Sequence, residues 1–355
     1  MARHEAYRYD RNVLTWASFS MVHFLPLPIV LVTGCGGSTR NSVDAEIPCA
    51  DNASCLRALT SGQTMPRNLA VDSTSAYWTN SCGPVMKVPL AGGTPTALVE
   101  DSLCPNDLAI DSTYVYLTVP SRPLQDASGF VMKVPLGGGA PTELVSGLDE
   151  PDSIAVDGSG VYWLENHDVP RLMKVPSDGG TPETLVEGLG WGEGIALDAT
   201  NVYWGDDRGN GASLIMTMPK TGGQSQVLAD GQDSLNAFAV YAGNVYWTTT
   251  KPIVDTEPTD SKIMTVPCAG GSPRVLAASD GFPSDLAVDG RGVYWNEYQG
   301  GKIVKVPLAG GPATTLVSDL VYPDAIALDA GNIYWTCSLV DDDKYDDGMV
   351  MARAR

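Results

Sequence analysis

The chain has 355 residues, with 42 acidic against 22 basic side chains, and its formal net charge at pH 7 is −20. So acidic a protein is repelled by nucleic acids and by anionic lipid headgroups, which leaves cations, basic proteins and neutral glycans as partners. Only three histidines are present, so a metal cage built from several imidazoles is disfavoured.

The first 34 residues are typical of an export signal. Three arginines precede an apolar stretch at residues 24–32, which is broken by prolines and is too short to span a bilayer. The stretch leads into Val-Thr-Gly-Cys at residues 32–35, which resembles the lipobox of bacterial lipoproteins. This resemblance implies cleavage before Cys35, acylation of its thiol and an extracytoplasmic position on the cell membrane, or on the outer membrane of a Gram-negative host. An ordinary secretory signal is the alternative, and the true start could be Met21.

Residues 35–55 would then form a lipid-anchored polar tether ahead of a folded domain at residues 56–355. Export permits disulfides among the six cysteines that follow Cys35. The candidate pairs are Cys49 with Cys55 and Cys82 with Cys104, while Cys268 and Cys337 have no obvious partner. The connectivity stays open, because a sequence alone does not determine it.

From Leu69 to near the C-terminus, a phrase of about 40 residues occurs seven times. Each copy opens with an apolar-Ala-apolar run that ends, in chain order, at Asp72, Asp111, Asp157, Asp198, Tyr241, Asp289 and Asp329. A Tyr-Trp pair follows, with its tryptophans at Trp78, Trp163, Trp204, Trp247, Trp295 and Trp335, and with Tyr116-Leu117 as the variant in the second copy. A period of this length with several short apolar runs per copy indicates a β-propeller.

The third copy shows the plan of one blade. Residues 151–163 hold two apolar runs around a turn with Asp-Gly, which predicts a hairpin, and residues 172–176 and 184–186 supply two further strands. The seventh copy stops after its third strand, at residues 349–353, and residues 56–62 mimic the fourth strand at residues 141–147. We therefore predict an all-β, seven-bladed propeller of four-stranded antiparallel blades, in which the N-terminal strand closes the last blade.

The Tyr-Trp pair and the Ala-Val-Asp strand resemble the YWTD propellers of the low-density-lipoprotein-receptor type, over residues 56–355. The resemblance implies the propeller architecture and a binding role. Two features depart from that family. Its propellers have six blades, and the closing Asp of the motif is matched only by Asp206, the other tryptophan-bearing copies having Asn80, Glu165, Thr249, Glu297 and Cys337 there.

Two repeated features are expected to be structural. One Tyr-Trp pair per blade suits packing in the wedge between splayed sheets. The repeated Asp stands at a hairpin turn, where its side chain can accept hydrogen bonds from amides two residues further on. His167 is expected to be a solvated loop histidine.

The loops that enter each inner strand, together with those between the second and third strands, should share one face, here named the upper face. Just before the inner strands stand Asp107, Asp152, Glu193, Asn236, Asp285 and Asp324. Carboxylate and amide oxygens that converge on the mouth of the central channel suit a hard cation such as Ca²⁺. The competing interpretation is that these side chains cap the turn. Trp191, Phe282 and Tyr322 lie in the same loops, where they could stack on a sugar, hold a peptide side chain or cover the channel.

The leading hypothesis is a non-enzymatic, monomeric, lipid-anchored propeller that binds an envelope protein or glycan through its upper face, without binding nucleic acid. The alternative resembles the gluconolactonase-type propellers, which are divalent-metal-dependent hydrolases. In that reading the six mouth residues hold the metal and a metal-bound water is the nucleophile. A quinone-cofactor dehydrogenase has little support.

Overall fold

The computed structural model describes residues 56–100, 103–120, 128–208, 212–250, 260–338 and 347–355. The signal at residues 1–34, Cys35 and the tether at residues 35–55 lie outside the described residues, as do Cys49 and Cys55. Within the described ranges there are 28 β-strands, and no helix is long and apolar enough to cross a membrane.

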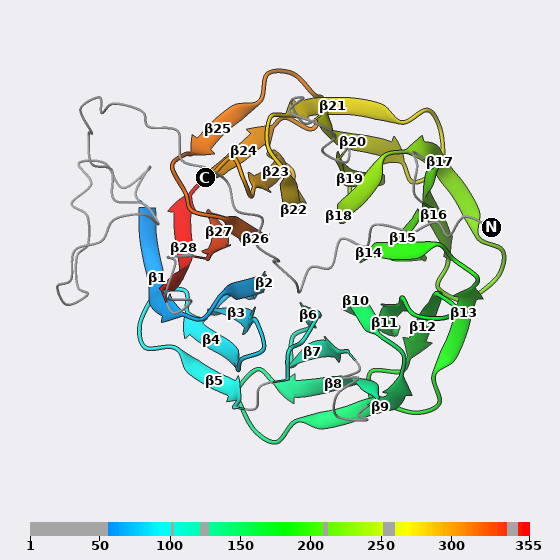
Figure 1. Ribbon diagram of the computed structural model, residues 1–355, viewed down its shortest axis with the longest axis horizontal. Coiled ribbons are helices and arrows are strands. Elements are labelled where there is room, and N and C mark those ends of the chain that lie inside the picture. Colours follow the sequence, from blue (N-terminus) through cyan, green and yellow to red (C-terminus); the bar gives the residue numbers. More distant parts are fainter. Residues whose placement is uncertain (1–55, 101–102, 121–127, 209–211, 251–259, 339–346) are drawn as a thin grey trace, which may run out of the picture. The chain divides into compact units, whose positions relative to one another are not determined.

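The strands form seven antiparallel sheets of four strands, arranged as the blades of a ring with the first strand of each blade innermost (Figure 1). Blade 1 comprises β2 (Pro66–Val71), β3 (Ser75–Asn80), β4 (Val85–Pro89) and β5 (Thr96–Val99), and blade 2 comprises β6 (Asp107–Ile110), β7 (Tyr114–Val119), β8 (Gly129–Pro135) and β9 (Thr142–Leu148). Blade 3 comprises β10 (Pro151–Asp157), β11 (Gly160–Glu165), β12 (Arg171–Val175) and β13 (Glu183–Glu187), and blade 4 comprises β14 (Trp191–Leu197), β15 (Asn201–Asp207), β16 (Ser213–Pro219) and β17 (Gln226–Gln232).

Blade 5 comprises β18 (Ser234–Tyr241), β19 (Asn244–Thr250), β20 (Ser261–Pro267) and β21 (Arg274–Ser279), and blade 6 comprises β22 (Pro283–Asp289), β23 (Gly292–Glu297), β24 (Lys302–Val306) and β25 (Thr314–Val317). Blade 7 comprises β26 (Pro323–Leu328), β27 (Asn332–Cys337) and β28 (Gly348–Ala354), with β1 (Leu56–Gln63) as its outer strand. The seven-bladed prediction is confirmed.

The ring closes as the repeat count predicts. β1 pairs antiparallel with β28, from Leu56 opposite Arg353 to Gln63 opposite Gly348. The first and last strands of the described chain therefore lie side by side in blade 7 (Figure 1), and β2 of blade 1 contacts β26 of blade 7. This closure covers the edge that β28 would otherwise expose for pairing with another chain.

The Tyr-Trp pairs fill the wedges between blades. All six tryptophans of the repeat are completely buried. Their clusters join neighbouring blades: Trp163 of blade 3 packs in one cluster with Tyr116 of blade 2, and Trp78 of blade 1 with Tyr334 of blade 7. The packing interpretation of these aromatic residues is therefore confirmed, and each ring contributes to holding two sheets together.

The repeated Asp is a turn device that also anchors the tyrosine. In blade 1, Asp72 Oδ1 accepts hydrogen bonds from the amides of Thr74 (2.6 Å) and Ser75 (2.8 Å), and Oδ2 accepts one from the hydroxyl of Tyr77 (2.8 Å). The same pattern occurs at Asp111, Asp198 and Asp329. Burial, with the hydrogen bond to Asp72, raises the pKa of Tyr77 to about 12, so the phenol stays protonated and donates.

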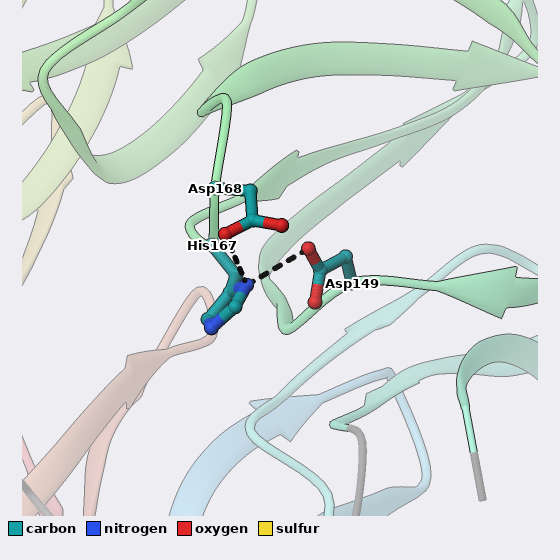
Figure 2. Close-up of side chains that lie close together, drawn as sticks. All are labelled: Asp149, His167 and Asp168. Carbon is teal, nitrogen blue, oxygen red and sulfur yellow. Dashed lines mark hydrogen bonds and ion pairs between the residues drawn. The ribbon is translucent and has the colours of Figure 1, made fainter.

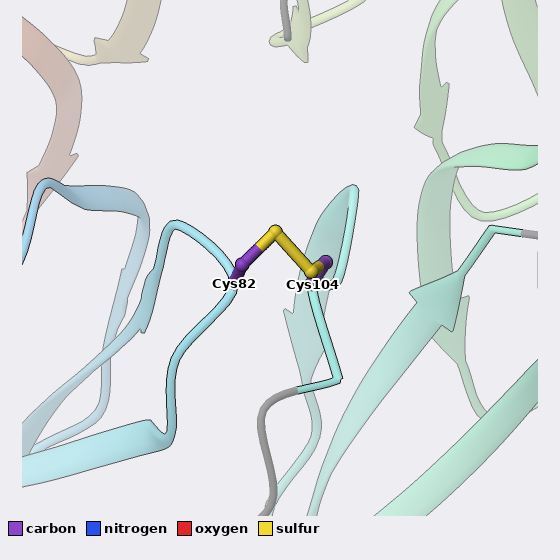
Figure 3. The surroundings of a disulfide bond; sticks show 2 residues. All are labelled: Cys82 and Cys104. Atoms are coloured by element: carbon purple, nitrogen blue, oxygen red, sulfur yellow. A yellow bond between two sulfur atoms is a disulfide. The ribbon is translucent and has the colours of Figure 1, made fainter. Parts of the chain in front are cut away.

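One of the candidate disulfides is present. Cys82, in the β3–β4 loop, is bonded to Cys104, in the segment that leads into β6, so the bond joins blade 1 to the entrance of blade 2 on the upper face (Figure 3). Cys268 is a free thiol. Cys337 in β27 is disulfide-bonded.

Candidate functional site

The mouth of the channel is lined by polar residues that tie one blade to the next. Asp107, at the start of β6, accepts hydrogen bonds from its neighbour Leu108 (2.8 Å) and from the amide of Ile154 in blade 3 (3.0 Å). Asp285 repeats this arrangement, accepting from Leu286 (2.8 Å) and from Ile326 in blade 7 (2.9 Å). Both oxygens of each carboxylate thus bond backbone amides, the arrangement that the capping interpretation expects.

Charge nevertheless accumulates at this mouth. Burial raises the pKa of Asp285 to about 7; the amide hydrogen bonds from Ile326 and Leu286 oppose that rise, and the charges of Asp324 and Asp107 add to it. Asp107 and Asp324 are therefore each close enough to repel Asp285. Desolvation, and not this repulsion, is the largest cause of the shift.

The other predicted mouth residues lie at the same ends of the inner strands, and all are half-buried. Asp152 accepts a hydrogen bond from Asn166 (3.0 Å), and Asn236 donates one to Thr250 (3.2 Å). Glu193 and Asp324 stand near the starts of β14 and β26. Over the described ranges, no three of these acids bring ligand oxygens within 4.8 Å of one another. The mouth is acidic, but its carboxylates are not gathered into an ion-binding cage.

Asparagine side chains also join the blades. The Asn68 side chain of blade 1 donates a hydrogen bond to the backbone carbonyl of Asn106 (2.7 Å). The Asn106 side chain in turn donates one to the backbone carbonyl of Pro151 in blade 3 (2.9 Å). Asn166 of blade 3 donates to the carbonyl of Gly192 in blade 4 (2.9 Å) and accepts from its amide (2.8 Å). These partners of Asn68, Asn106 and Asn166 lie outside their own blades, which no local pattern indicates.

A second group of ligating atoms lies on blade 3 (Figure 2). His167 Nδ1 lies 2.9 Å from Asp149 Oδ2 and 3.3 Å from Asp168 Oδ1, and the ligand atoms of the three residues all fall within 4.8 Å of one another. The hydrogen bond and charge of Asp149 raise the pKa of His167. His167 lies in a loop, as expected, but it is half-buried and paired, and it links two loops. One imidazole and two carboxylates could ligate a divalent transition metal, although the Asp168 side chain is 82% exposed.

The predicted aromatic residues are on the upper face, in two places. Trp191, at the start of β14, is 40% exposed. Tyr322, 39% exposed, lies against Tyr298, with ring centroids 5.0 Å apart and planes tilted by 34°. The amide of Tyr298 donates to the carbonyl of half-buried Phe282 (2.8 Å), in the segment that leads into blade 6. We call Tyr298 and Tyr322 the tyrosine pair. Tyr298 was missed, and its place directly after the Tyr-Trp strand was the available signal.

No protein-family model matches the chain, and no curated protein matches it either. Among solved structures, the chain is similar to a streptogramin B lyase (TM-score 0.63, 13% identity, covering 83% of this chain and 96% of that one). It is also similar to the computationally designed protein Ika8 (TM-score 0.54, 12% identity, 82% and 98% covered) and to a structure of a nidogen/laminin complex (TM-score 0.48, 21% identity, 65% and 84% covered). The likenesses to the lyase and to Ika8 support the propeller fold and nothing finer.

Proposed function

We propose that the protein is a lipid-anchored, extracytoplasmic binding module that holds an envelope protein or glycan on its upper face. The observation that carries this proposal is the tyrosine pair. All six packing tryptophans are completely buried, whereas Tyr322 and Trp191 are large aromatic side chains exposed on the upper face. Partly exposed aromatic rings that are not needed for packing supply the contact area and stacking surfaces typical of recognition sites.

The charge favours a protein partner with a basic surface. The net charge of −20 attracts basic segments at long range, and the acidic mouth lies on the same face as the tyrosine pair. Tyrosine faces also attract arginine and lysine side chains. A neutral glycan, which would use the rings for stacking alone, is the other outcome that the test distinguishes.

The hydrolase alternative is the weaker one. Carboxylate oxygens without other partners favour a metal at the mouth, but both oxygens of Asp107 and of Asp285 already accept hydrogen bonds from backbone amides. We expect millimolar Ca²⁺ at constant ionic strength to leave the melting temperature unchanged. A rise in Tm would instead favour a bound ion, because a ligand that binds the folded state stabilises it.

The binding role is tested with the full-length protein in detergent, titrated with a set of basic peptides and a set of neutral oligosaccharides. We expect saturable binding to one set, lost in the double variant Tyr298→Ala/Tyr322→Ala. The matched control is Val227→Ala/Val275→Ala, which removes two exposed side chains from the outer strands β17 and β21. Binding that survives loss of the tyrosine pair, or no binding to either set, contradicts the proposal.

The anchor is tested separately. Cys35→Ser should move the protein from the detergent phase into the soluble extracytoplasmic fraction, because only an acylated thiol holds it to the membrane. Unchanged partitioning of this variant would contradict lipid anchoring and leave the binding role untouched.

A further inference from the structure

Three blades carry a buried acid two residues after the repeat tryptophan. In blade 3, Glu165 is paired with Arg171, whose Nε and Nη2 lie 2.8 and 2.7 Å from Oε2. In blade 4, Asp206 is paired with Arg208, whose Nη2 lies 2.8 Å from Oδ2. Both acid side chains are completely buried. The fold thus satisfies this buried carboxylate with a guanidinium, whose planar donors suit it well.

The third acid, Glu297 of blade 6, lacks such a partner. Its Oε1 accepts hydrogen bonds from Ser279 (2.7 Å) and Trp295 (3.4 Å), but its Oε2 has no hydrogen-bond partner among the residues that the structure describes. Lys302 faces Glu297 across the strand pair, as Arg171 faces Glu165, yet its Nζ stays 3.7 Å from Oε2. The Glu297 side chain is only 4% exposed. A buried oxygen without a hydrogen bond is costly, and a donor from outside would relieve that cost.

A cavity of about 150 Å³ lies against this carboxylate, and its lining includes Asp280, Trp295, Lys302 and Thr315. Its origin is visible in the repeat. The residue opposite the repeat tryptophan or leucine on the third strand is methionine in six blades: Met86, Met132, Met173, Met216, Met264 and Met351. In blade 6 it is Val304, which also lines the cavity. The shorter valine leaves beside Trp295 the space that methionine fills elsewhere.

We propose that this blade 6 cavity binds a guanidinium group. The charge fits, because Asp280 and Glu297 outnumber Lys302 on the wall. The size fits, since a cavity of this volume accepts a group as large as benzene. Lys302 is 35% exposed and can turn toward solvent as the ligand enters. Glu297 then accepts from a guanidinium as Glu165 and Asp206 do, with Thr315 as a further polar wall.

The inference rests on the proposed function for the source of the guanidinium, which is an arginine side chain of the bound protein. Tyr298 follows Glu297 directly at the upper end of β23, so the cavity and the tyrosine pair lie at the same end of blade 6. A partner protein could then place one arginine in the cavity and the apolar or basic residues next to that arginine on the rings of the tyrosine pair, so that the two sites form one continuous contact. The same chemistry would also accept a free small guanidine compound, and the test separates the two sources.

The test titrates the full-length protein in detergent with L-argininamide, with acetyl-Gly-Arg-Gly-amide and with L-citrullinamide, using ligand-observed NMR. We expect saturable binding of both guanidinium probes and none of citrullinamide, which has the same shape without the charge. Glu297→Gln should weaken binding at least tenfold, whereas Glu187→Gln, an exposed glutamate on β13, should not. Preference for the tripeptide indicates a protein source, and preference for the free amino-acid amide indicates a small molecule.

Two substitutions that the repeat itself suggests make the test decisive. Val304→Met restores the side chain of the other blades and should abolish binding without lowering the melting temperature. Lys302→Arg supplies the guanidinium from within, as Arg171 does in blade 3, and should also block the probes. Probe binding that persists unchanged in these variants and in Glu297→Gln, or no binding to the wild type, overturns the inference.

The outcome is separable from that of the proposed function. Argininamide binding at the blade 6 cavity needs no partner, so it can succeed where the peptide and glycan sets fail. Conversely, a partner whose affinity depends on the tyrosine pair but is unchanged by Val304→Met would support the binding role and contradict the guanidinium site.

Discussion

Removal of the Asp329 carboxylate in blade 7 measures what the turn device contributes. Asp329 Oδ1 accepts hydrogen bonds from the amides of Gly331 (2.7 Å) and Asn332 (2.6 Å), and Oδ2 accepts one from the Tyr334 hydroxyl (2.6 Å). A hydrogen bond to a charged group contributes about 1.5–3 kcal/mol, and a lost cap costs about 1 kcal/mol. Asp329→Ala should therefore lower the free energy of unfolding by about 2–4 kcal/mol at pH 7.

Two further variants separate the contribution of the Tyr334 hydrogen bond from that of the backbone amides. Tyr334→Phe removes only the phenol hydrogen bond and should cost about 1–3 kcal/mol. Because both single variants break the same bond, the double variant should cost less than the sum of the two. Asp230→Ala, which removes an exposed carboxylate from β17, is the control and should change the free energy of unfolding by less than about 0.5 kcal/mol.

The pH dependence of the same variants has a definite sign. Partial burial alone would raise the pKa of Asp329, but the hydrogen bonds from Tyr334, Gly331 and Asn332 outweigh it and lower the pKa below its ordinary value of 3.8. The charge thus stabilises the fold above pH 3.8, and this contribution is lost as the pH falls through the lowered pKa. Urea unfolding at pH 7 and near pH 3 measures it. An Asp329→Ala loss equal to that of the control, or one that grows as the pH falls, would refute the reasoning.

Three further predictions concern the closure, the disulfide and the mouth. Deletion of residues 56–63 should expose β28, lower the melting temperature and promote self-association, which calorimetry and light scattering detect; an unchanged monomer of equal stability would contradict closure by β1. Cys82→Ser/Cys104→Ser should lose about 3 kcal/mol of unfolding free energy for a loop of this length, measured in urea without reductant, and added reductant should remove the difference between the wild type and the variant. Asp285, with its pKa raised to about 7, is more readily protonated in the folded state than when unfolded, so its stabilisation is greatest below pH 4 and is lost as the pH rises through 7. The unfolding free energy of the wild type relative to Asp285→Ala should therefore fall over that range, and a flat or rising difference would contradict the burial of this carboxyl.

Much of the fold followed from the sequence because each blade repeats the same short-range devices. The Asp at the turn and the tyrosine five residues later act within one hairpin, so their spacing alone predicts the hairpin. Closure by residues 56–62 followed from counting strands: the repeat contains seven first strands but only six fourth strands, so one further strand was needed to complete the last blade. Packing by the tryptophans followed from their regularity.

The sites were less predictable because their partners lie in other blades. Asp107 bonds the amide of Ile154, 47 residues further on, and no local pattern distinguishes that bond from an open ligand oxygen. Tyr298 becomes part of a tyrosine pair only when blades 6 and 7 are brought together. Val304 departs from the repeat by a common apolar exchange, and the resulting cavity is meaningful only once Glu297 is known to lie beside it without an arginine.

The most direct test of the binding role is to locate the backbone amides that a bound ligand protects from hydrogen exchange. Hydrogen exchange of the full-length protein is compared with and without a saturating ligand from the peptide or oligosaccharide sets. We predict slower exchange in the upper-face segments at residues 280–284, 298–301 and 320–324. Protection confined to the turns between the third and fourth strands on the opposite face, such as residues 270–271 and 310–311, would contradict this binding role.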